Sequence, residues 1–207
     1  MKNVILYFSR TLICLSILVV IGCEKKDSIV NPPEELTEIV PLKIGNQWTF
    51  VRTEFDTLGS ITRIDTIQYK IIEDTLINNQ KWFRQSYWTV LYRNDEEGFW
   101  EYNNEPKLAY KYPAQEGSIF YNNYGWKVTV ISTDTLINTP LGILHCYQYQ
   151  LDFYGFKTNN FLSPGFGFVY MEGAARWYAP YPHLTDPFLF EKWELISADI
   201  TKIIIDR

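Results

Sequence analysis

Histidine and cysteine, the residue types that most often carry catalytic or metal chemistry, are rare in this chain of 207 residues. The histidines are His145 and His183, and the cysteines are Cys14, Cys23 and Cys146. No pair of them has the spacing of a zinc site, and the chain lacks the Gly-x-Ser-x-Gly turn of serine hydrolases. His145 and Cys146 are adjacent in a strand-like run, where neighbouring side chains point to opposite faces. We therefore expect no catalytic residue, no metal site and no cofactor.

The densest acidic cluster is Asp95-Glu96-Glu97, directly before Gly98. A calcium loop needs oxygen ligands at alternating positions through about twelve residues, and this cluster is instead followed by two aromatic residues. A solvated hairpin tip is the expected structure, with a weak cation site as the alternative. The separation of paired carboxylates for glycoside hydrolysis is set in space, so an envelope hydrolase stays as a minor alternative function.

Cys23 stands at the end of an apolar segment that begins after Lys2 and Arg10. From Thr11 to Ile21 nearly every residue is apolar, which is the pattern of a signal peptide. The residues Val20-Ile21-Gly22-Cys23 resemble the lipobox of bacterial lipoproteins at all four positions. The resemblance implies cleavage before Cys23, a thioether-linked diacylglycerol on its sulfur and an acylated amine. An uncleaved membrane helix and a soluble secreted product are the alternatives; the helix would have to include Arg10, which is costly in a bilayer.

Three segments follow from this interpretation. Residues 1–22 are expected to be a lipoprotein signal peptide, 23–39 a disordered tether containing Asn31-Pro32-Pro33-Glu34-Glu35, and 40–207 a single β-rich domain. The membrane is the expected partner, through lipidated Cys23. Glu24 after the cysteine resembles outer-membrane sorting signals, so we expect a lipid-anchored protein of the cell envelope at the outer membrane. The membrane face that the domain occupies stays open.

The charge of the chain argues against nucleic acid as a partner. Without Lys2 and Arg10, 17 basic residues face 24 acidic ones, a net charge of −7. A surface of that sign repels phosphate backbones.

The composition is that of a β protein, with 15 Tyr, 13 Phe and 7 Trp. We expect roughly nine to eleven strands in an all-β fold, a curved antiparallel sheet that forms a barrel or half-barrel; the alternative is a two-sheet β-sandwich of two similar halves. The word Asp74-Thr75-Leu76-Ile77-Asn78 recurs as Asp134-Thr135-Leu136-Ile137-Asn138, and whether it marks a true repeat stays open. The turns are expected at Leu58-Gly59-Ser60, Asn78-Asn79 and Asn94–Gly98. The strands are expected at Trp48–Phe55, Thr62–Ile72, Lys81–Tyr92, Gly98–Tyr102, Trp126–Leu136, Leu141–Phe153, Asn160–Glu172 and Phe190–Ile205.

Two short blocks in the body resemble exported lipoproteins, notably those of Bacteroidota. The first, Pro41-Leu42-Lys43-Ile44-Gly45-Asn46-Gln47-Trp48, matches a Pro-Leu-x-x-Gly-Asn-x-Trp start. The second, Pro164-Gly165-Phe166-Gly167-Phe168-Val169, matches a late Pro-Gly-x-Gly-x-Val segment. The resemblance implies a domain type and no chemistry. The two glycines share a strand face, which predicts a bulge or the close approach of an aromatic neighbour.

Aromatic residues are the candidate ligand contacts. Their first role is to fill the core and pair across strands, and their second is to line a groove for a glycan, lipid or protein ligand. We expect a non-enzymatic binding or scaffolding protein; the alternative is a carrier or chaperone that holds an apolar ligand in an open half-barrel. The candidates are Trp88, Trp100, Trp126, Trp177, Tyr178 and Tyr181.

Overall fold

The computed structural model describes residues 29–30, 38–56, 58–122, 124–153, 155–174 and 190–200. These residues form thirteen strands and no helix, more strands than the nine to eleven predicted. Because no described helix exists, none could span a membrane. The strands are β1 (Ile29–Val30), β2 (Gln47–Phe55), β3 (Ile61–Ile77), β4 (Gln80–Gln85), β5 (Leu91–Asp95), β6 (Gly98–Asn103), β7 (Glu105–Lys111), β8 (Ile119–Tyr121), β9 (Lys127–Thr139), β10 (Gly142–Phe153), β11 (Phe156–Ser163), β12 (Gly167–Ala174) and β13 (Phe190–Asp199).

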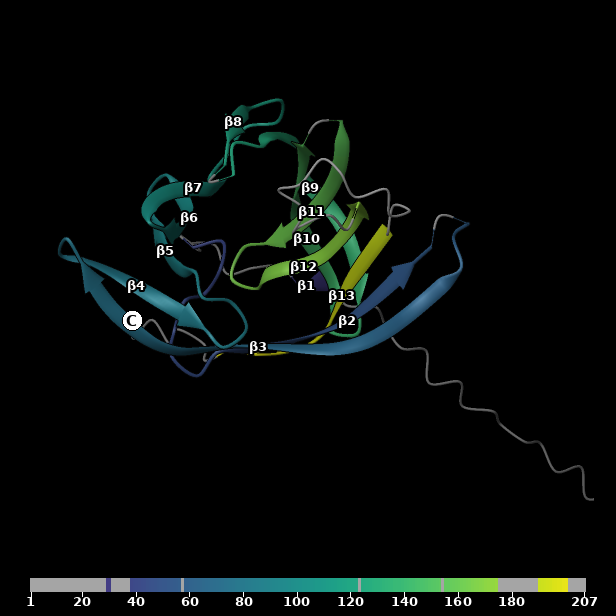
Figure 1. Cartoon of the computed structure of the whole chain (residues 1–207), viewed down its shortest axis with the longest axis horizontal. Helices are drawn as coiled ribbons and strands as arrows, with labels where there is room; N and C mark the ends of the chain where they lie inside the picture. The colour runs from purple at the N-terminus through teal and green to yellow at the C-terminus, as the bar shows by residue number, and fades with distance from the viewer. Residues whose placement is uncertain are drawn as a thin grey trace, which may run out of the picture.

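Twelve of these strands follow one another in a single antiparallel sheet that curves almost into a closed barrel (Figure 1). The order is β7-β6-β5-β4-β3-β2-β13-β12-β11-β10-β9-β8. The two ends of this order, β7 and β8, are consecutive along the chain, so residues 112–118 connect them. The predicted curved all-β sheet is confirmed, and the alternative two-sheet sandwich is not observed.

The long strand β3 connects the two sides of the molecule, as the lower edge of Figure 1 shows. Its first part pairs with β2, and its last part, from Ile71, pairs with β4. The backbone of Lys70 bonds to Ser86, whereas the backbone of Ile71 bonds to Gly45 and Asn46. Adjacent strand residues direct these groups to opposite edges, so β2 and β4 lie on opposite sides of β3.

The predicted turns are confirmed where the sequence carries glycine or asparagine. Asn78 and Asn79 both have positive φ and form a two-residue hairpin turn between β3 and β4. The repeated five-residue word ends the first strand of a hairpin in both copies, at β3 and at β9. In the first hairpin, Asp74 pairs with Lys81, which lies opposite Leu76 in the ladder. In the second, Asp134 pairs in the same way with His145, which lies opposite Leu136.

Several predicted strand limits were wrong. The single strand expected at Lys81–Tyr92 is two, β4 and β5, because the backbone bends over residues 86–90, where Ser86 bonds to β3. The strand expected at Asn160–Glu172 is divided into β11 and β12 by the turn at Pro164-Gly165, and Gly165 has a φ of 75°. Strands β7 and β8 were not predicted, since β7 contains Pro106 and three charged residues and β8 has only three residues.

Residues 38–46, which we call the plug, contribute Ile39, Val40 and Leu42 to the buried core. The four consecutive carbonyls of residues 38–41 accept hydrogen bonds from Gly165 N, Gly167 N, Asn94 Nδ2 and Asn46 Nδ2. Ile39 and Val40 are almost fully buried. The packed body therefore includes Ile39, which falls in the segment 23–39. Ile29 and Val30 of that segment form β1, parallel to the start of β10.

The plug brings together the two blocks that resemble exported lipoproteins. Trp48 Nε1 donates a hydrogen bond of 2.6 Å to the carbonyl of Phe166. A Cβ placed on Gly167, whose φ is 80°, would lie 3.2 Å from Val40 Cγ1. The close neighbour of this glycine is thus an aliphatic side chain, whereas the sequence predicted an aromatic one. A bulge is found two residues further on, at Val169, in the pairing of β11 with β12.

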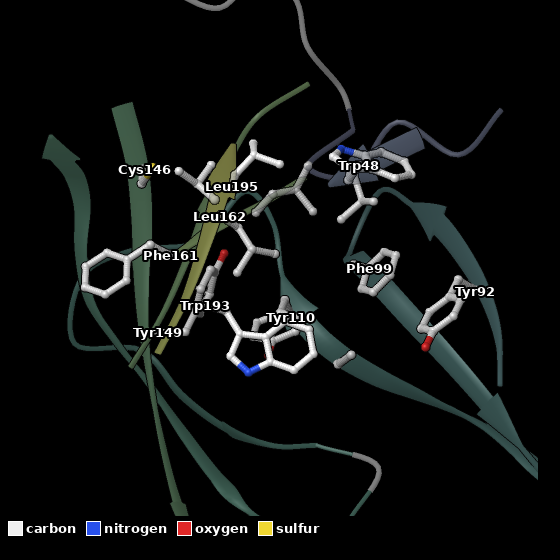
Figure 2. Packing of buried hydrophobic residues seen from close by; sticks show 14 of the residues in the cluster. Trp48, Tyr92, Phe99, Tyr110, Cys146, Tyr149, Phe161, Leu162, Trp193 and Leu195 are labelled. Carbon is white, nitrogen blue, oxygen red and sulfur yellow. The ribbon is translucent and has the colours of Figure 1, made fainter. Parts of the chain in front are cut away.

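The interior of the barrel is filled by large side chains. A row of rings crosses it from Tyr92 through Phe99 and Tyr110 to Tyr149, with centroids 5.3, 6.5 and 5.0 Å apart (Figure 2). Cys146 lies in this core with no exposed surface, and burial raises the pKa of its thiol to about 12. The thiol is therefore a small apolar core group, as predicted.

Candidate functional site

The inner face of the sheet, which carries the core, continues beyond the buried rings into an aromatic cluster of Phe50, Tyr69, Tyr87, Trp88 and Trp193. Alternation along β2, β3 and β13 places Phe50, Tyr69 and Trp193 on this face. Tyr69 stacks on Trp193 with centroids 6.0 Å apart and an interplanar angle of 11°. Tyr87 meets Tyr69 edge-on at 5.3 Å and Trp88 at 4.9 Å.

The Trp88 indole donates a hydrogen bond to the Tyr69 hydroxyl, which fixes the bend between β4 and β5 against β3. Trp88 itself is half-buried, and Tyr87 is 47% exposed. The cluster therefore offers ring surface to solvent on a support that is held in place by buried rings. Exposed aromatic rings on a rigid scaffold are typical of a binding surface.

Charged side chains lie beside this cluster on the same face. Arg52 lies 5.6 Å from the centre of the Trp193 ring and pairs with Asp65 at 2.5 Å and Glu54 at 3.3 Å. The Arg52 guanidinium lowers the pKa of the Asp65 carboxyl. Trp193 Nε1 donates to Glu191, whose pKa is raised by burial. The positive charge of Arg52 is thus neutralised by carboxylates within the protein.

A second group, which we call the carboxyl cluster, consists of Glu101, Tyr92, Tyr110 and Asn160. Glu101 shares a face with Phe99 on β6 and is paired in register with Tyr92 on β5 and Lys107 on β7. Lys107 forms its ion pair with Glu105 instead. Within the described residues, no hydrogen bond or ion pair reaches the Glu101 carboxyl, and burial alone raises its pKa to about 7.

Hydrogen bonding in the carboxyl cluster is incomplete. Asn160 Nδ2 donates to the Tyr110 hydroxyl at 2.5 Å, while Asn160 Oδ1 is buried and without a partner in the described structure. Burial raises the pKa of both the Tyr92 and Tyr110 hydroxyls, and the negative charge of Glu101 raises both pKa values further. A half-buried carboxyl without a partner costs stability, and such groups gather at functional sites.

Both groups lie on the inner face of the sheet, and we call them together the inner-face site. Tyr87 is exposed and Trp88 and Glu101 are half-buried, whereas Tyr92, Tyr110 and Asn160 are almost fully buried.

The structure separates the predicted contact residues. Trp88 belongs to the inner-face site. Trp100 lies on the opposite face of β6, where its Nε1 donates to Asp95 and Arg93 stacks between its ring and that of Trp82. Trp126 packs against Tyr124 and Phe153, with centroids 5.4 and 5.0 Å away, in the connection from β8 to β9. The remaining predicted site residues, Cys23, Trp177, Tyr178 and Tyr181, lie outside the described residues.

The acidic cluster at residues 95–97 forms the tip of the β5–β6 hairpin. One carboxylate oxygen, Asp95 Oδ1, accepts from the backbone of Glu97 and Gly98 and from the Trp100 indole. No group of three or more His, Cys, Asp or Glu side chains in the described part of the chain could hold a metal ion.

Sequence reasoning missed Glu101, Arg52, Tyr69 and Trp193 as site residues. Strand alternation could have revealed Glu101. It lies two residues after Phe99, so its side chain points to the same, core-facing side of the strand. The contact between residues of β2, β3 and β13 could not have been predicted from the sequence, because β2 and β13 pair although they are far apart along the chain.

Comparisons with known proteins show a likeness to a solved structure. No family model and no curated protein matches this chain. A solved structure of a "putative lipoprotein from Parabacteroides distasonis" is similar with a TM-score of 0.41 and 12% sequence identity, over 80% of this chain and 100% of that one. At that TM-score the likeness carries no inference about the function of this chain.

Proposed function

We propose that this protein is a lipid-anchored protein of the cell envelope whose β domain binds a ligand at the inner-face site without catalysing a reaction. The observation that carries the binding role is the inner-face site itself. It combines the exposed ring of Tyr87 and the half-buried ring of Trp88 with the Glu101 carboxyl, which has no partner among the described residues. Groups of this kind contribute contacts and hydrogen bonds to a ligand.

Binding is favoured over catalysis by the state of the reactive groups. The Cys146 thiol is buried and has a raised pKa, which makes it a poor nucleophile. His145 pairs with Asp134 on the exposed β9–β10 hairpin, and no residue of the inner-face site lies on β9 or β10. An envelope hydrolase would need a second carboxyl facing Glu101 across a substrate, whereas the groups around Glu101 are tyrosine hydroxyls.

The filled interior favours a surface binder over a carrier. A carrier holds an apolar ligand inside the barrel, but here the interior is occupied by Tyr92, Phe99, Tyr110 and Tyr149. The expected test is a thermal shift of the full chain in detergent with a bacterial envelope extract. We expect the extract to raise the Tm of the wild-type protein and to leave that of Trp88→Ala unchanged; an equal shift in both proteins would contradict the proposed site.

The anchoring role rests on the lipobox at residues 20–23, and the outer membrane is the proposed location. We expect Cys23→Ala to abolish lipidation, because the sulfur of Cys23 is the atom that carries the diacylglycerol. Metabolic labelling with a radioactive fatty acid checks this, with Cys146→Ala as the matched control that keeps the label. Label on the Cys23→Ala protein would show that the lipobox interpretation is wrong.

A further inference from the structure

We propose that the β9–β10 hairpin is the end of the domain that faces the membrane, and that its uncharged tip lies against the lipid head groups. This inference rests on the proposed lipid anchor at Cys23, and it adds which side of the domain meets the bilayer. Three observations carry it: the pairing of β1, the short chain between β1 and Cys23, and the residues of the hairpin.

Strand β1 lies on the edge of β10 that β11 leaves open. β9 pairs with one edge of β10 from Gly142 onward, whereas β11 pairs with the other edge only from Tyr147 onward. Ile29 lies opposite Ile143 in a parallel pair, so β1 takes the part of that edge before Tyr147. Because β1 and β10 run in the same direction, the N-terminal end of β1 lies beside the β9–β10 turn, which directly precedes Ile143.

The residue that carries the proposed lipid is close to β1 along the chain. Five residues separate Cys23 from Ile29. Even a fully extended chain of that length spans only about 20 Å. The lipid on Cys23 is therefore held within that distance of the β9–β10 turn, and this end of the domain stays close to the bilayer surface.

The β9–β10 hairpin has the composition that a lipid surface accepts. Residues 135–144 contain five leucine or isoleucine residues and no Asp, Glu, Lys or Arg, and Leu136 is 53% exposed. The hairpin at the first copy of the five-residue word differs, because residues 75–84 include Lys81 and Arg84. In an acidic chain, an uncharged apolar hairpin is a part that anionic head groups do not repel, and its exposed apolar side chains gain from burial at the head-group boundary.

Polar groups of the β9–β10 turn bond to one another. Thr139 Oγ1 donates to the Gly142 carbonyl at 2.8 Å and accepts from the Leu141 N–H at 3.1 Å. Polar groups that are already paired lose little when lipid replaces water around them. The turn can therefore approach the head groups at a low desolvation cost.

The test uses the lipidated full chain in vesicles of phosphatidylethanolamine with a quarter phosphatidylglycerol. A fluorescent label is attached through Leu136→Cys or, as the matched control, through Leu76→Cys, at the same leucine of the first copy of the word, which is 71% exposed. The native Cys146 is fully buried and its thiol has a raised pKa, so it does not compete for the label. We expect lipids with a nitroxide on the head group to quench the label at position 136 about threefold more strongly than the label at position 76, and soluble iodide to show the reverse order.

A second pair of variants tests the part played by β1. Proline has no backbone N–H, so the double variant Ile29→Pro, Val30→Pro removes the donors that β1 brings to β10. The label at position 136 should then lose its additional quenching by nitroxide lipids. The matched control Ile29→Ala, Val30→Ala keeps both N–H groups and should keep the quenching. Unchanged quenching in the proline variant would overturn the inference that β1 orients the domain.

The outcomes separate this inference from the proposed anchor. Equal quenching of the two labels by nitroxide lipids would overturn the inference, and flotation of the protein with the vesicles would still support the anchor. Protection of position 136 from iodide without quenching by nitroxide lipids would mean that a second copy of the chain, and not lipid, covers the hairpin. Failure of the wild-type chain to float with vesicles would reject the anchor and this inference together.

Discussion

The plug and the inner-face site differ in how their polar groups are satisfied. In the plug, four consecutive carbonyls accept hydrogen bonds, and the nearby Trp48 indole donates to a backbone carbonyl. In the inner-face site, the Glu101 carboxyl has no partner among the described residues and the pKa of that group is raised. The difference indicates that the plug contributes to stability, whereas the inner-face site contains a carboxyl whose polar atoms have no partner among the described residues.

The largest expected effect belongs to Trp48, on β2 directly after the plug. Trp48→Ala should lower the free energy of unfolding by about 3–5 kcal/mol, because it leaves a cavity in the core and leaves the Phe166 carbonyl without its donor. Urea unfolding followed by fluorescence measures the loss. Tyr121→Ala, at a residue that is 67% exposed, should change stability by less than about 0.5 kcal/mol. A loss at Trp48 below about 1 kcal/mol would mean that this indole does not hold the fold together.

In the inner-face site, by contrast, a substitution is expected to raise the free energy of unfolding. The folded-state pKa of Glu101, about 7, lies above its usual value of 4.5, so the folded chain binds more protons between these pH values and loses stability as the pH rises through them. Glu101→Gln removes this charge and should raise the unfolding free energy at pH 8 by about 1–3 kcal/mol, with little difference at pH 4. Urea titrations at both pH values check the sign. A destabilised variant at pH 8 would show that the carboxylate has a partner.

The smallest expected effect concerns Gly167, and it distinguishes the cost of its backbone conformation from the cost of a contact with Val40 in the plug. Gly167 has a φ of 80°, where a Cβ costs about 1–2 kcal/mol, and that Cβ would also press on Val40. We expect Gly167→Ala to lower stability by about that amount and the double variant with Val40→Ala to be less than additive. Gly155→Ala, at a φ of 85° with open space around it, is the control for the φ effect alone. Equal losses at Gly167 and Gly155 would show that Val40 does not constrain the site.

The sequence allowed the fold to be predicted where its signals are local. The alternation of aromatic residues and the Asn78-Asn79 turn act over a few residues, and both the sheet and that turn were found. The bend at residues 86–90 was missed because its cause is a contact with Lys70, which the strand-like composition of Lys81–Tyr92 conceals. The same limit applies to the site: Trp88 was predicted as a contact residue, but its partner Tyr69 is on β3 and only the fold brings the two together.

The plug also has a consequence for the order in which the chain folds. The bond from Trp48 joins residues 118 positions apart, and the bonds from Gly165 and Gly167 close on Glu38 and Ile39 over even longer loops. Contacts that distant are the slowest to form, because the loop must close before any contact rewards it. A chain that leaves the ribosome from its N-terminus holds the carbonyls of Glu38 and Ile39 without their partners until the start of β12 has followed. We therefore expect the newly made chain to present the apolar side chains of Ile39 and Val40 in an open segment, and to become protease-resistant only when β12 docks on them.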